Sequence, residues 1–153
     1  MGFTTARKGE LALTGGAVGS LADQIATLLT GLRRAGAAPG DLALLRVFYR
    51  HDAPGAADLK AALAAALPAE TRTALSLVPV VQAGTGDGLL SIEAAAIVTR
   101  HGPPRQVAGP VEGPFVAGVR QGRFVFLGAV AGMAADGIVA ESTSVMRQLG
   151  ATL

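Results

Sequence analysis

The feature that most constrains the fold of this chain is a stretch of sequence that occurs twice. Residues 9–15 read GELALTG, and residues 122–128 read GRFVFLG, 113 positions later. The apolar positions of a following helix also recur, 117 positions later, which implies an insertion of four residues near 133–136. They are Leu28, Leu29 and Leu32 in the first copy and Val145, Met146 and Leu149 in the second. Because each copy of a repeat is one structural unit, this recurrence bears on the architecture before any motif is interpreted.

The first copy has the periodicity of a domain that alternates strands and helices. Ser20 and Asp23 have the spacing of a helix N-terminus, and the apolar residues after them recur at helical spacing. The nearly continuous apolar run over 42–50 is typical of a buried strand. The expected strands are 2–8, 10–14, 42–50, 71–82 and 89–98, and the expected helices are 20–35 and 56–67. The order ββαβαββ predicts an α/β (α+β) domain with a mixed sheet, both helices on one face and the other face bare.

The composition changes after residue 100, which divides the chain into three parts. Residues 1–100 form the expected domain. Residues 101–112 hold three prolines and show no periodicity, so they are expected to form a linker. Residues 113–153 then repeat the opening of the first domain, and they predict a ββα half-repeat, the N-terminal half of a second domain.

A ββα half-domain cannot cover its own apolar residues. Either the first domain folds back over them, or another polypeptide supplies the missing βαβ half, and we favour the second alternative. The side chains concerned are Phe124, Val125, Phe126, Val145, Met146 and Leu149.

The chain is strongly apolar, with a mean hydropathy of +0.46 and only 16% charged residues. Its longest uncharged stretch, 73–86, is interrupted by proline, glutamine and glycine, so it lacks the roughly 20 apolar residues of a membrane span. The N-terminal residues lack the apolar core of a secretory signal. We therefore expect a cytoplasmic protein, without membrane segments, that buries its excess apolar surface in an oligomer interface.

Two residue types are scarce or missing, which argues against several classes of function. The chain has no cysteine and two histidines, so we expect no zinc, iron–sulfur or histidine metal centre. Its arginines are scattered, without a basic stripe or interleaved aromatic residues, so we expect no nucleic-acid binding.

Five segments together form a recognisable pattern. They are 46–50 (RVFYR), 72–75 (RTAL), 91–98 (SIEAAAIV), 110–115 (PVEGPF) and 119–127 (VRQGRFVFL). In their order and spacing they resemble the YjgF/YER057c/RidA family, the reactive-intermediate deaminases. Residues 3–100 look like one nearly complete domain of that family, and residues 109–153 look like the opening of another.

The resemblance implies a fold, an assembly and a chemistry. The fold is chorismate-mutase-like, and it assembles as a trimer or pseudo-trimer whose ligand clefts lie between neighbouring subunits. The family's activity is hydrolysis of imines and enamines, which implies here a small-molecule substrate with a carboxylate. No cofactor is expected, because an imine is already electrophilic.

The resemblance also assigns candidate site residues. Arg72 aligns with the family's signature arginine, and its guanidinium could hold a substrate carboxylate through two parallel hydrogen bonds. Glu93 aligns with a late glutamate of the family and could orient the water that attacks an imine carbon. The alternatives are a surface arginine that ends a loop and a carboxylate on the exposed side of an amphipathic strand. Thr73, Thr14 and Phe115 complete the expected substrate site, with Phe115 as one wall.

Three departures from the family pattern keep two functions open. Phe115 stands where the family's Gly-Pro-Tyr turn has its tyrosine, and residues 14–16 read TGG where the family has Ser-Gly-Gln. The asparagine expected in the second helix, near Leu59 or Lys60, is absent. The chain is therefore either an imine or enamine deaminase, or a related hydrolase of a biosynthetic pathway, or a non-catalytic subunit that completes a RidA-like heteromeric assembly.

Overall fold

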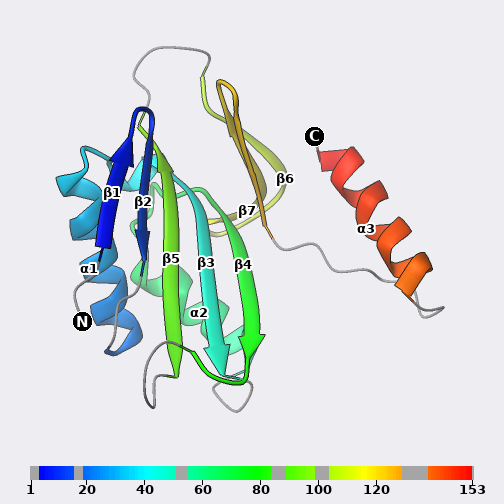
Figure 1. The fold of residues 1–153 in the computed structure, drawn as a ribbon, viewed down its shortest axis with the longest axis horizontal. Helices are drawn as coiled ribbons and strands as arrows, with labels where there is room; N and C mark the ends of the chain where they lie inside the picture. The colour runs from blue at the N-terminus through cyan, green and yellow to red at the C-terminus, as the bar shows by residue number, and fades with distance from the viewer. Residues whose placement is uncertain are drawn as a thin grey trace.

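The first part of the chain folds into a sheet with two helices (Figure 1). The computed structural model describes residues 4–15, 19–50, 55–83, 89–98, 104–128 and 138–152. The strands up to residue 97 are β1 (Thr4–Lys8), β2 (Leu11–Gly15), β3 (Leu42–Arg50), β4 (Thr73–Val80) and β5 (Leu90–Ile97). The helices are α1 (Leu21–Arg34) and α2 (Ala56–Ala66), with a 3₁₀ turn, η1 (Pro39–Asp41), before β3. The predicted order ββαβαββ is confirmed.

One mixed sheet runs through the molecule in the order β1-β2-β5-β3-β4 and continues beyond β4. Strands β3 and β4 are parallel, whereas β5 is antiparallel to both of its neighbours, β2 and β3. Figure 1 shows α1 and α2 on the same side of this sheet, as predicted. On that side Leu45, Val47 and Ile92 are fully buried with the helix side chains. The side of β1–β5 that faces away from α1 and α2 is called the open face below.

Local signals explain where the two helices begin and what they bury. Ser20 caps α1, because its Oγ accepts a hydrogen bond of 3.2 Å from the Asp23 N–H. Leu28 and Leu32, four positions apart on α1, are buried against the sheet. Helix α2 is mostly alanine and buries only Leu59 and Leu63. The attachment of α2 therefore depends on few side chains.

Part of the segment expected as a linker, 101–112, forms a strand instead. Strand β7 (Phe115–Gln121) lies next to β4 in the sheet, and β6 (Gln106–Glu112) pairs antiparallel with β7 at the edge. Its register shifts around Gly109, whose φ of +76° is the left-handed conformation of a bulge. Proline and glycine favour a linker in the sequence, but an edge strand tolerates both at a bulge. The expectation of a linker is therefore corrected over 106–112.

The two copies of the repeated segment form similar hairpins. Strand β8 (Phe124–Leu127) pairs with β7 as β2 pairs with β1, and in both hairpins a glycine at the turn, Gly9 or Gly122, has a φ near +60°. Helix α3 (Ile138–Thr152) follows, and Figure 1 shows it apart from the sheet. The expected insertion at 133–136 lies outside the described residues, and the assignment of 113–153 to a second domain stays a prediction. None of the helices in the described ranges is long and apolar enough to cross a membrane.

The β7–β8 hairpin is packed against the first domain. Val116 and Val119 of β7 are buried in a cluster with Ala43 and Ile97, and Phe124 and Phe126 of β8 pack against this cluster. The first domain thus covers part of the apolar surface of the second copy. By contrast, Val125 and Met146 are 44% and 67% exposed. A second polypeptide that covers these two side chains stays a prediction.

A solvent-exposed ion pair joins α2 to β6, and it supports a first testable prediction. The Lys60 ammonium donates a hydrogen bond to the Glu112 carboxylate, and this bond, together with the charge of Lys60, holds the pKa of Glu112 below its usual value. We expect Lys60→Met to raise the pKa of Glu112, which carboxyl ¹³C NMR titration measures. A lowered carboxyl pKa contributes stability at neutral pH that is lost as the pH falls through that pKa, so the variant should lose less stability on acidification.

The matched control for this prediction is Lys8→Met, which removes an exposed lysine on β1. It should leave the titration of Glu112 unchanged. If the pKa of Glu112 were the same in the Lys60→Met variant as in the wild type, the ion pair would be absent in solution.

Candidate functional site

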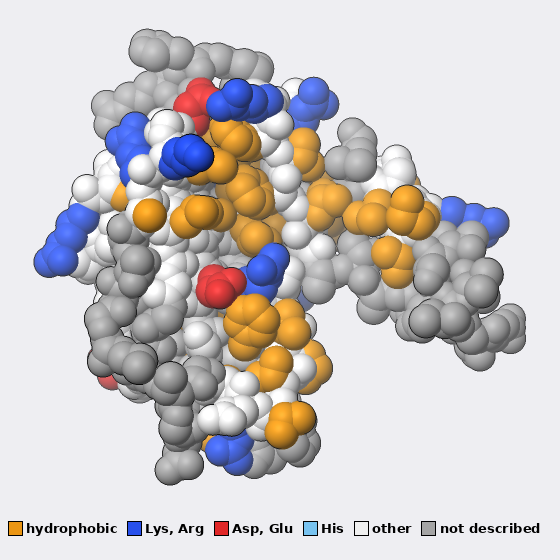
Figure 2. Space-filling view, viewed as in Figure 1, with side chains coloured by type: hydrophobic (Ala, Val, Ile, Leu, Met, Phe, Trp, Pro, Cys, Tyr) orange, Lys and Arg blue, Asp and Glu red, His pale blue; other side chains and the backbone are white. Residues whose placement is uncertain are grey.

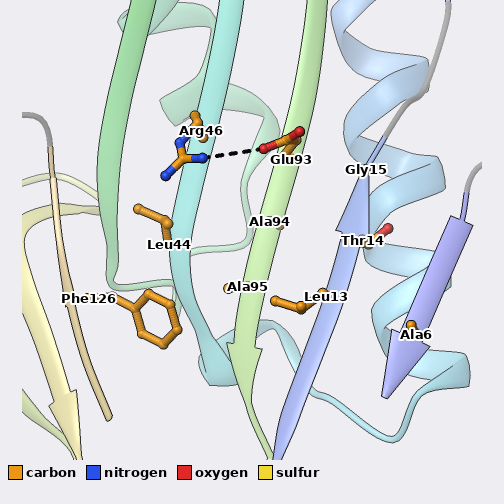
Figure 3. A pocket seen from close by; sticks show the side chains of 10 residues that line it. All are labelled: Ala6, Leu13, Thr14, Gly15, Leu44, Arg46, Glu93, Ala94, Ala95 and Phe126. Atoms are coloured by element: carbon orange, nitrogen blue, oxygen red, sulfur yellow. Dashed lines mark ion pairs between the residues drawn. The ribbon is translucent and has the colours of Figure 1, made fainter. Parts of the chain in front are cut away.

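The open face carries a cavity of about 450 Å³ (Figure 3). Side chains of β2, β5 and β3 line it in two neighbouring rows across the sheet. Gly15, Glu93 and Arg46 form the ionic row, and Leu13, Ala95 and Leu44 form the apolar row. Figure 2 shows hydrophobic side chains gathered along this face on both sides of adjacent acidic and basic side chains. The cavity is therefore an apolar surface with one charged end.

The charged end is an ion pair between neighbouring strands. Arg46 Nη1 lies 3.6 Å from Glu93 Oε2, and the two side chains are 46% and 50% exposed. This distance is longer than a hydrogen bond, so the five N–H donors of the guanidinium are not fixed by the carboxylate. An ion pair this exposed contributes at most about 1 kcal/mol to stability. Both side chains are thus placed to contact a ligand, and the fold does not depend on their contact.

Gly15 makes room for the Glu93 side chain. The two residues are register partners on β2 and β5, and a Cβ added to Gly15 would lie 3.2 Å from Glu93 Cγ. That separation is tighter than ordinary van der Waals contact, so a larger residue at this position would displace the Glu93 side chain.

The far end of the cavity is lined by a residue of the second copy. Phe126 of β8 lies beside Leu44 in Figure 3, at the end of the cavity away from Arg46 and Glu93. The hairpin that carries Phe126 lies close to β4. The approach is so close that a Cβ added to Gly128 would lie 2.8 Å from the carbonyl oxygen of Leu75. The second copy therefore contributes to a site whose other residues belong to the first.

The structure does not bring Arg72 and Glu93 together within one chain. Arg72 Nη1 donates hydrogen bonds to the carbonyl oxygens of Ala69 (3.0 Å) and Thr71 (2.6 Å), and Arg72 does not line the cavity. On β4 the register partner of Arg46 is Ser76, four residues beyond Arg72. At about 3.3 Å per residue, Arg72 lies about 13 Å along the sheet from the ionic row. Its role as a carboxylate ligand stays a prediction.

The other expected residues lie in different environments. Thr73 and Phe115 are register partners on β4 and β7, and both are buried outside the cavity. Phe115 belongs to the helix-covered core, where the Lys60 ammonium is 6.0 Å from its ring centroid.

Thr14 lines the cavity, but it is 5% exposed and alternates with Leu13 and Gly15, which places its side chain on the helix-covered side. Of the five residues, only Glu93 directs a functional group into the cavity.

Three residues of interest are not predicted as site residues by the sequence. Arg46 had a signal, since it is an arginine inside an otherwise apolar strand, and Phe126 had a weaker one in the repeat. Arg105 had none: its Nη2 donates hydrogen bonds to the carbonyl oxygens of Leu42 and Arg72, which joins the first residue of β3 to the residue before β4. Burial lowers the pKa of Arg105, and the charge of Asp41 offsets part of this effect.

No protein-family model matches the chain, and no curated protein matches it. Several solved structures do match the chain. A member of the YjgF/YER057c/UK114 family from Mycobacterium tuberculosis matches with a TM-score of 0.50 and 24% identity, over 61% of this chain and 84% of that one. A chorismatase matches with a TM-score of 0.65 and 14% identity, over 99% of this chain.

The two similarities cover different lengths of this chain. The YjgF-type structure accounts for about the length of the first domain, whereas the chorismatase match also includes the hairpin and α3. This chain spans 56% of the chorismatase. The ββαβαββ order, the mixed sheet with helices on one face and these two matches lead to one conclusion: the chain has a YjgF/Rid-like, chorismate-mutase-like fold.

Proposed function

We propose that the chain hydrolyses a small imine or enamine that carries a carboxylate, and that the cavity on the open face binds this substrate. The observation that carries the proposal is the pair of Arg46 and Glu93 in a mostly apolar cavity. A guanidinium recognises a carboxylate through paired N–H donors. A carboxylate beside it can accept a proton from water. The Rid-like fold supports the same reaction class by analogy only.

In the proposed reaction, Arg46 holds the substrate carboxylate and Glu93 accepts a proton from a water molecule. The water oxygen bonds to the imine carbon, and the electron pair of the C=N double bond moves to nitrogen. Glu93 then returns the proton to that nitrogen. When the C–N bond breaks, the hydroxyl proton leaves with the nitrogen as ammonia and a C=O group forms. One water and one imine thus give one 2-oxo acid and one ammonia.

The predicted role of Arg72 requires an assembly. Arg72 and Glu93 are about 13 Å apart along the sheet of one chain, so a neighbouring subunit would have to bring one of them to the other. We propose a trimer or pseudo-trimer in which open faces meet, because a half-exposed apolar surface such as Leu13 gains stability when it is covered.

The second candidate function is a non-catalytic subunit of a heteromeric assembly. It is supported by the exposure of Val125 and Met146, and by the match to just over half of a larger protein. The name of that protein, chorismatase, suggests chorismate as a further carboxylate-bearing ligand to test. In this alternative the cavity binds a ligand without converting it.

An oxidase-coupled assay tests the proposed reaction. An amino-acid oxidase generates the imine, semicarbazide traps what remains, and hydrolysis by the protein lowers the yield of semicarbazone. We expect Arg46→Met to raise KM by about 10-fold to 100-fold, because a hydrogen-bonded charge contact contributes about 1.5–3 kcal/mol to binding. Arg72→Met, tested beside it, shows whether the predicted second arginine takes part.

The matched control is Arg123→Met, which removes an arginine that is 79% exposed at the turn of the β7–β8 hairpin. Its KM should equal that of the wild type. If the wild type lowers the semicarbazone yield no more than buffer does, the enzyme proposal fails and the non-catalytic alternative is favoured.

A further inference from the structure

The two rows of the cavity point to the kind of substrate it accepts. We propose that it takes 2-imino acids with a branched or aromatic hydrocarbon side chain, and that Phe126 of the β7–β8 hairpin determines this preference. This inference rests on the proposed function for the reaction, but the selectivity also applies to binding alone.

The spacing of the rows fits such a molecule. Leu44 and Ala95 each lie two residues from Arg46 and Glu93 on the same strands, so the rows are about 6.6 Å apart. A carboxylate held by Arg46 therefore places a side chain of leucine size over the apolar row. A methyl group, as in the imine of alanine, would not reach it.

The apolar row has its smallest side chain at its centre. Ala95 stands between Leu13 and Leu44 as the register partner of both, so the two larger side chains flank a small one. This leaves a hollow that a hydrocarbon group of the ligand can fill. Burial of each methylene group there strengthens binding about fourfold.

Phe126 closes this hollow on the side of β3. Its side chain is partly buried, packs against the cluster of Val116 and Val119, and still lines the cavity. The neighbouring Val125 is 44% exposed and does not line it. Selectivity in the first domain would therefore depend on a side chain from the second copy.

The experiment compares kcat/KM for imines derived from leucine, phenylalanine and alanine. For the wild type we expect the leucine and phenylalanine imines to be preferred over the alanine imine by about 10-fold to 60-fold. Phe126→Ala should reduce this preference to about threefold or less, with little change for the alanine imine. Phe126→Leu should restore most of it, and Val125→Ala should leave it unchanged.

Binding measurements separate this inference from the reaction. Isothermal titration with 4-methyl-2-oxopentanoate and with pyruvate measures the same selectivity without hydrolysis. If the wild type hydrolyses imines but shows no preference, or if Phe126→Ala keeps the preference, this inference is overturned and the proposed function stands. If the wild type hydrolyses no imine, the binding data decide. Tighter binding of 4-methyl-2-oxopentanoate than of pyruvate, with the difference lost in Phe126→Ala, supports the inference. Equal binding of the two oxo acids, or no binding of either, overturns it.

Discussion

Replacing Glu93 with glutamine is expected to lower kcat for imine hydrolysis by about two to four orders of magnitude. Glutamine keeps the shape of the side chain opposite Gly15, but its amide cannot accept a proton from water. Loss of a general base typically costs 10²–10⁴ in rate, roughly. KM should change far less, since Arg46 still holds the carboxylate. The two variants therefore differ: Glu93→Gln lowers kcat, whereas Arg46→Met raises KM.

The control for this change is Glu10→Gln, at a carboxylate that pairs with Arg123 on the protein surface. It should keep the wild-type kcat. Thermal unfolding of the Glu93→Gln protein should stay close to that of the wild type, because the ion pair with Arg46 is half exposed. A Glu93→Gln enzyme with undiminished kcat would exclude Glu93 as the base.

Leu63→Ala is expected to lower the free energy of unfolding by about 2–5 kcal/mol. Leu63 is fully buried, and together with Leu59 it accounts for the buried side chains of α2. The other positions of α2 are largely alanines, which offer little apolar area to compensate. Urea unfolding followed by circular dichroism measures the change.

The exposed neighbour Ala62 provides the control for Leu63→Ala. Ala62→Ser, on the same helix, should change the free energy of unfolding by less than about 1 kcal/mol. Equal stabilities of the Leu63→Ala protein and the wild type would show that α2 does not pack on the sheet as described.

The elements of the first domain could be predicted because each carries a local signal. The apolar run 42–50 coincides with β3, and Ser20 caps α1 as its spacing with Asp23 indicates. Strand β6 could not be predicted in this way. An edge strand with a bulge contains the same glycine and proline that mark a connecting segment, so composition does not distinguish the two.

The candidate site was only partly predictable, because the register between two strands cannot be determined from the sequence of either strand alone. The family resemblance predicts that Glu93 acts with Arg72, yet the pairing of β5 with β3 places Arg46 beside Glu93. A shift of a few residues in either strand would have given a different partner. The contribution of Phe126 depends on the packing of β8 over the first domain, which the repeat alone does not specify.

The central position of β5 also has a consequence for protein synthesis. Strand β5 begins at Leu90, yet it lies between β2, which ends at Gly15, and β3. While the ribosome has released only the segments before β5, the β1–β2 hairpin has no strand that connects it to β3 and β4. The nascent chain must keep these apolar pieces apart until β5 emerges and inserts between them. A pause in translation that holds residues 90–97 inside the ribosomal exit tunnel would prolong this state and favour aggregation.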